Sequence, residues 1–132
     1  MKLFLKVFAL VALFLVVVSP NSVVAKNANK AVTVEINFGN ETPLKSASVS
    51  WESDLTALEA LMHVAEVSTH AVGEYVFVSK IDQVKGVPTK YVWYYKINGQ
   101  SPKKLAINQK LKKGDVVTWI YKQDVCSDKK CK

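Results

Sequence analysis

Two stretches decide the fold of this chain: Tyr91-Val-Trp-Tyr-Tyr-Lys-Ile-Asn98-Gly99 and Leu111-Lys-Lys-Gly114-Asp115-Val-Val-Thr-Trp119-Ile-Tyr121. Each joins an aromatic strand to a turn. Asn-Gly tolerates positive φ at both central positions of a hairpin, and Gly-Asp before a β-branched run marks another chain reversal. The stretches predict an antiparallel sheet. Neither contains a nucleophile, a metal-ligand cluster or a phosphate loop, so they favour a surface that binds over a site that reacts.

The remaining strands follow from alternation of apolar and polar residues, which is typical of half-buried strands. Residues 32–38 and 46–51 alternate before the aromatic stretches, and residues 75–81 form a third such run. With 91–97 and 116–122 they make five expected strands. Residues 82–90 contain Gly and Pro and predict a loop, and the Lys-rich stretch 101–113 is expected to hold one short strand near residues 105–107.

One helix is expected between the second and third strands. Thr56 with Glu59 three residues on is a capping box, which predicts a helix over residues 57–68 that ends before Gly73. Its apolar stripe is Leu58, Leu61, Met62 and Ala65. The element order is therefore β-β-α-β-β-β, an α+β single domain.

The ordered set of motifs resembles the transcobalamin-like C-terminal domain family. The residues that carry the resemblance are Thr56-Ala-Leu-Glu-Ala-Leu61, Gly73-Glu-Tyr-Val-Phe-Val-Ser-Lys-Ile81, the Trp93 strand with Asn98-Gly99, Lys113-Gly114-Asp115 and Trp119-Ile-Tyr121. It covers roughly residues 31–122. The resemblance implies a β-grasp-like mixed sheet of about four or five strands packed on one helix.

The N-terminus predicts export. A basic start with Lys2 and Lys6 precedes an unbroken apolar run over residues 7–18, and small residues follow up to Ala25. This is the pattern of a cleaved signal peptide over residues 1–25, and the run is too short for a typical membrane span. An uncleaved anchor is the alternative. After cleavage we expect a mobile leader over residues 26–30 and a secreted or periplasmic protein without a membrane span.

The charge of the chain argues against nucleic acid as a partner. The chain has 132 residues and a formal net charge of +7, and all of its 18 basic residues are Lys. Arg is the usual residue for bidentate contacts with phosphates and bases. A solvated Lys-rich surface explains the charge, and weak attraction to acidic envelope polymers is the alternative.

Both cysteines, Cys126 and Cys131, lie in a tail over residues 123–132. An exported chain meets an oxidising compartment, so an intramolecular disulfide is expected. Bonds to another chain, free thiols and metal binding remain the alternatives. Asn40 begins an N-glycosylation acceptor motif, and the sequence does not decide whether it is used.

No candidate catalytic group has the partners that catalysis requires. His63 lies on the polar side of the expected helix, and His70 lies at its end, where the helix dipole favours a cation. The serines, among them Ser48, Ser50 and Ser79, lack the Gly-x-Ser-x-Gly elbow. Asp115 fits a turn. We therefore expect no enzyme, no metal site and no cofactor.

The aromatic residues of the last strands are the better candidates for a binding site. One helix covers one face of such a sheet, so some of them should be exposed, and Trp and Tyr are enriched at binding hot spots. Ordinary core packing is the alternative for each. The candidate ligand or partner contacts are Trp93, Tyr95, Trp119 and Tyr121.

The predicted function is that of an exported, non-catalytic binding module for an envelope or extracellular protein or glycan. The resemblance implies a second candidate: the related domain of transcobalamin-like proteins forms a lid over a corrinoid held against a helical barrel. A lone lid supplies half a pocket, so cobalamin binding would need a partner. A small hydrolase is the third alternative.

Overall fold

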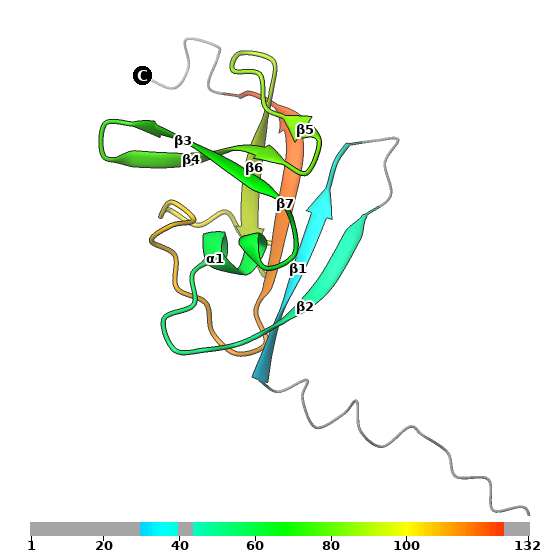
Figure 1. Cartoon of the computed structure of the whole chain (residues 1–132), viewed down its shortest axis with the longest axis vertical. Helices are drawn as coiled ribbons and strands as arrows, with labels where there is room; N and C mark the ends of the chain where they lie inside the picture. Colours follow the sequence, from blue (N-terminus) through cyan, green and yellow to red (C-terminus); the bar gives the residue numbers. More distant parts are fainter. Residues whose placement is uncertain (1–29, 40–43, 126–132) are drawn as a thin grey trace, which may run out of the picture.

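The computed structural model describes residues 30–39 and 44–125 (Figure 1). The expected signal peptide, nearly all of the expected leader, Asn40 and the Cys126–Cys131 pair lie outside the described residues. The described elements follow one another as β1 (Ala31–Asn37), β2 (Lys45–Ser50), α1 (Ala57–Met62), β3 (Val67–Val72), β4 (Tyr75–Ile81), β5 (Val84–Lys85), β6 (Tyr91–Ile97) and β7 (Val116–Gln123).

The strands form two sheets rather than one. The larger sheet has four strands in the order β2-β1-β7-β6, and the smaller has three in the order β3-β4-β5. In the larger sheet β1 and β7 are parallel, while β2 and β6 pair antiparallel at the two sides. The smaller sheet crosses over one end of the larger, and α1 lies on the same side (Figure 1).

The core lies between the larger sheet and the elements that cover it. Strand β1 supplies Val32, Val34 and Ile36, each at most 1% exposed, because alternate side chains of a strand point to one face. Helix α1 supplies Ala60 and Leu61, which are fully buried. The expected alternation of residues 32–38 is therefore confirmed as a half-buried strand.

Helix α1 begins as predicted but ends early. The Thr56 Oγ1 accepts a hydrogen bond from the Glu59 amide, and a Glu59 carboxylate oxygen accepts from the Thr56 amide at 2.9 Å. Hydrogen bonds from Thr56 hold the pKa of Glu59 below its usual value, and the bond from the Thr56 backbone amide has the largest effect. The capping box is confirmed, but the helix stops at Met62 rather than at residue 68.

The residues predicted to finish the helix form a strand instead. Residues 67–72 pair antiparallel with β4, with a register shift between Ser68 and Thr69. Pairing with the strongly β-forming run 75–81 outweighs the weak helical preference of these residues. Met62, expected in the apolar stripe, is the last residue of α1 and is 56% exposed.

The Lys-rich segment between β6 and β7 contains no strand at residues 105–107, so that prediction is wrong. The segment is instead attached to α1 by backbone hydrogen bonds from Ala57 and Leu58 to the carbonyls of Gln109 and Ala106. Its Ala106 side chain is buried in the core. Its carbonyls thus satisfy the free amides of the first helical turn.

The described chain is therefore a β-rich fold with two sheets and one short helix, in place of the single sheet of four or five strands that the sequence suggested. None of the helices in residues 30–39 and 44–125 is long and apolar enough to cross a membrane.

Candidate functional site

The two candidate tryptophans are core residues. Trp93 is 8% exposed and Trp119 is 2% exposed, since the smaller sheet and the 101–113 segment cover the face of the larger sheet on which they lie. Tyr95 and Tyr121 share that face and are half-buried. Of the four predicted contacts, only the two tyrosines therefore reach the surface, and the tryptophans cannot touch a partner directly.

The buried aromatic residues join the two sheets. The Trp93 Nε1 donates to the Val84 carbonyl at 3.0 Å, and the Tyr121 hydroxyl donates to the Lys85 carbonyl at 3.2 Å. Because both acceptors belong to β5, these bonds attach the smaller sheet to β6 and β7. The rings of Trp93 and Tyr121 also pack at a centroid distance of 5.2 Å.

Tyr95 connects the larger sheet to the Lys-rich segment. Its ring stacks on Trp119 with centroids 5.1 Å apart, and its hydroxyl donates to the Lys104 carbonyl. Tyr95 is half-buried and packs against the core. Burial raises the pKa of Tyr95 from 10.0 to about 12.

We expect Tyr95 to ionise near pH 12 in the folded protein, while its pKa in the unfolded chain is near 10. Because the pKa is higher in the folded state, the neutral phenol contributes stability that is complete below pH 10. This contribution is lost as the pH rises from 10 to about 12. Titration followed by near-ultraviolet absorbance measures the ionisation of the Tyr95 phenol. A Tyr95→Phe variant that leaves the high-pH end of the titration curve unchanged would contradict the prediction.

An exposed apolar surface lies elsewhere, on the hairpin of β3 and β4. Val72 is 55% exposed, Tyr75 61% and Phe77 46%. Tyr75 and Phe77 alternate along β4 and so share one face, and Val72 lies opposite Tyr75 across the hairpin. The two rings are 6.4 Å apart. We call Val72, Tyr75 and Phe77 the hairpin patch.

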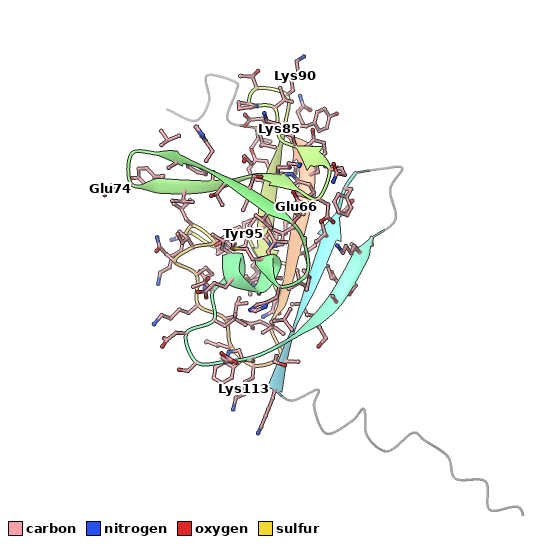
Figure 2. All side chains as sticks on the ribbon, in the orientation of Figure 1. Glu66, Glu74, Lys85, Lys90, Tyr95 and Lys113 are labelled. Carbon is pink, nitrogen blue, oxygen red and sulfur yellow. The ribbon has the colours of Figure 1, made fainter. Side chains whose placement is uncertain are left out.

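The hairpin extends away from the rest of the molecule, with Glu74 at its turn (Figures 1 and 2). Gly73 has φ +60°, which favours glycine at this turn. On the opposite face of the hairpin, Val78 packs against the core. One face of the hairpin is thus anchored and the other is presented to solvent.

The hairpin patch does not follow from the sequence pattern, because the capping box predicts a helix over residues 57–68 that ends before Gly73 and so leaves no strand to pair with residues 75–81. The signal was nevertheless present, since Tyr75-Val-Phe-Val-Ser-Lys-Ile81 has large apolar residues at every position of its first half. A strand with apolar residues on both faces needs two covers. In the described structure the face with Val78 packs against the core, whereas the face with Tyr75 and Phe77 is exposed.

The other polar candidates are scattered. His63 and His70 are exposed, and the Ser79 hydroxyl donates to the Ser68 carbonyl at 3.1 Å. An open depression beside β2 and α1 brings some of them near one another, and its lining consists of Ser48, Val49, Ser50, Glu52, Leu55, His63 and Val64.

Asp115 has the turn role that the sequence predicted. Its Oδ2 accepts from the Lys112 amide at 2.8 Å, and its Oδ1 accepts from the Asn98 Nδ2 at 2.9 Å. As for metals, no three His, Cys, Asp or Glu side chains gather into a possible metal site within residues 30–39 and 44–125.

Residues 54–123, more than half of the chain, match a protein family described as Domain of unknown function (DUF4430). The chain belongs to this family. The DUF4430 match begins just before α1 and ends with β7, so it includes the hairpin patch and the Lys-rich segment.

A solved structure resembles the chain in fold. It is the crystal structure of a protein from Ruminococcus gnavus ATCC 29149 described as a "putative metal binding protein". The TM-score is 0.58 at 14% sequence identity, and the match covers 72% of this chain and 98% of the other. At this identity the likeness concerns the fold alone. No curated protein matches the chain.

Proposed function

We propose that this chain is a non-catalytic binding module whose contact surface is the hairpin patch. The observation that carries the proposal is the exposure of Val72, Tyr75 and Phe77 on one face of a projecting hairpin. Neighbouring exposed apolar side chains mark recognition surfaces in soluble proteins. Aromatic residues at such places provide large contact area with few rotatable bonds.

The partner that fits this surface best is a protein with an exposed strand or an extended segment. Strand β3 is at the edge of the smaller sheet, so the backbone groups on its outer side face away from β4. An extended segment can add to such an edge through main-chain hydrogen bonds, while pockets or apolar side chains give specificity. The patch beside that edge supplies the apolar contact.

Export completes the proposal. The apolar run near the N-terminus and the small residues up to Ala25 support a secreted or periplasmic location, where the partner would be an envelope or extracellular protein. The proposed module needs no cofactor and performs no reaction. Metal binding, which the description of the R. gnavus protein names, has no candidate ligand group in the described part of this chain.

Site-specific photo-crosslinking tests the hairpin patch. We expect a photoreactive residue at position 77 to yield one discrete adduct in the envelope or secreted fraction of the producing cells. The same residue at Leu44, which is 55% exposed and lies outside the hairpin, is the control and should yield none. The absence of an adduct at position 77, or equal adducts at both positions, would refute the hairpin as contact surface.

The adduct partner, once purified, allows the energetic test. Tyr75→Ser should weaken binding by about 30-fold or more, because a hot-spot residue carries about 2 kcal/mol. Its effect on the free energy of unfolding should stay within about 0.5 kcal/mol, since its side chain is 61% exposed. Leu44→Ser, at a residue 55% exposed outside the hairpin, is the matched control and should leave binding unchanged. Equal loss in both variants would count against the proposal.

A corrinoid lid is the second candidate, and the strand order is the observation that favours it. The order β2-β1-β7-β6 with parallel inner strands and a helix on one side is consistent with a β-grasp-like sheet, as the transcobalamin-like resemblance implies. In that case the hairpin patch would cover a corrinoid held by a second protein. Titration with cobalamin, followed by its visible spectrum, tests this. If cobalamin shows a spectral change with the unchanged protein and none with Tyr75→Ser, the hairpin patch binds a corrinoid rather than a protein.

A further inference from the structure

The segment between β6 and β7 concentrates positive charge. Residues 101–114 contain Lys103, Lys104, Lys110, Lys112 and Lys113, and they contain no Asp or Glu. All five lysines are exposed. We call residues 101–114 the basic segment. The molecule therefore carries a second surface feature whose chemistry differs from that of the apolar hairpin patch.

The basic segment is held in place despite lacking regular secondary structure. The Leu111 amide donates to the Leu55 carbonyl at 2.8 Å, and the Trp51 Nε1 donates to the Leu111 carbonyl at 2.8 Å. Leu111 itself is 4% exposed. The Tyr95 hydroxyl holds the carbonyl of Lys104. With the bonds to α1, these contacts fix the backbone, so the lysines project from a preorganised base.

Little of this charge is compensated within the described residues. Lys110 pairs with Asp54, and the ammonium of Lys113 lies 4.9 Å from the centre of the Trp51 ring. The described ion pairs include none of the other lysines of the segment. The Asp115 carboxylate at its end already accepts two hydrogen bonds from the turns. Lys103, Lys104 and Lys112 are therefore the cations best placed to meet an external anion.

We propose that the basic segment binds a linear acidic polysaccharide through its lysine ammonium groups. Several cations along one ordered segment can contact successive charges of a polymer, and such weak contacts reinforce one another. This surface and this ligand are distinct from those of the hairpin patch. A module with both could be kept near an anionic polymer while the hairpin binds its partner.

The side chains of the segment favour carboxylates on a polymer over nucleic acid or a lipid surface. The chain has no Arg, and a Lys ammonium is a hydrated point charge that needs no fork-shaped acceptor. Residues 101–114 contain no aromatic side chain on which a base could stack. Ile107 is the segment's one large apolar residue that is substantially exposed, which leaves little to insert into a bilayer.

The test measures binding to polygalacturonate, with uncharged dextran as the reference polymer. We expect binding to polygalacturonate that weakens steeply as salt is added, because the charges are exposed and screened. The triple variant Lys103→Ser, Lys104→Ser, Lys112→Ser should lower the affinity by roughly tenfold, since the loss of each exposed ion pair costs about twofold.

A second triple variant separates the effect of the lysines in the basic segment from the effect of lowering the net charge of the protein. Lys85→Ser, Lys90→Ser and Lys122→Ser remove the same charge outside it, and Lys85 and Lys90 lie at the end of the molecule opposite Lys113 (Figure 2). This variant should lose less than about threefold, since only long-range attraction is reduced. Equal losses in the two variants would overturn the proposal, as would absence of binding or tighter binding to duplex DNA or anionic vesicles.

The hairpin patch serves as an internal check. Tyr75→Ser should bind polygalacturonate as the unchanged protein does, because Tyr75 is not part of the basic segment. The failure of polymer binding would leave the hairpin proposal standing, and the failure of crosslinking at position 77 would leave the polymer proposal standing. Loss of polymer binding in Tyr75→Ser would contradict the assignment to the basic segment.

Discussion

Replacing Trp119 with Ala is expected to lower the free energy of unfolding by about 3–5 kcal/mol, the usual cost of truncating a buried large aromatic residue. Trp119 is 2% exposed on β7, opposite Ile36 of β1 and Tyr95 of β6. Its Nε1 is buried without a hydrogen-bond partner in the described structure. The loss therefore comes from apolar contacts and from the cavity left behind.

Urea denaturation with two probes measures this loss. Tyr75→Ala is the control, because Tyr75 is 61% exposed and its truncation should change stability by no more than about 0.5 kcal/mol. A cost below about 1.5 kcal/mol for Trp119→Ala would contradict the placement of Trp119 as a buried core residue.

The second large effect is expected at Asp115. Asp115→Ala should cost about 2 kcal/mol, because its carboxylate accepts two hydrogen bonds and bonds to charged groups are the stronger class. One bond comes from the Lys112 amide within its own turn. The other comes from Asn98, whose Oδ1 in turn accepts from the Val116 amide at 2.9 Å. The residue thus joins the turn after β6 to the turn before β7.

The same denaturation experiment with Asp115→Asn separates the charge from the shape. The amide keeps one acceptor oxygen, so we expect it to retain about half of the lost stability. Glu74→Ala, which removes a carboxylate at the exposed hairpin turn, should have little effect. Equal costs for Asp115→Ala and Glu74→Ala would show that the bond between the two turns contributes nothing.

Local patterns in the sequence predicted the strands well. The ranges 75–81 and 91–97 agree with β4 and β6, and those of β1 and β2 differ by one residue. Alternation and turn residues act within a few positions, so they can be read directly. The end of α1 could not be, because residues 67–72 form a strand only through pairing with β4.

The candidate site was harder to predict for a related reason. The sequence pattern favours a shared face for Trp93 and Tyr95 and for Trp119 and Tyr121 within each strand, without the register of β6 and β7 that brings all four to one face of the sheet. It could not say what covers that face. A second sheet and the basic segment do so and bury the two tryptophans, while the exposed Tyr75 and Phe77 lie on a hairpin that the sequence had not predicted.

The parallel pairing of β1 and β7 has a consequence for how this fold is reached. Thr33 lies beside Val116, so the first strand of the described chain is completed by the last. Contacts between such distant residues cost loop-closure entropy before they contribute stability, and folds built on them form slowly. Until β7 is present, β1 has only β2 beside it in the larger sheet. The larger sheet therefore forms only once β7 has been synthesised, and a truncation before residue 116 would remove an inner strand of that sheet rather than an edge strand.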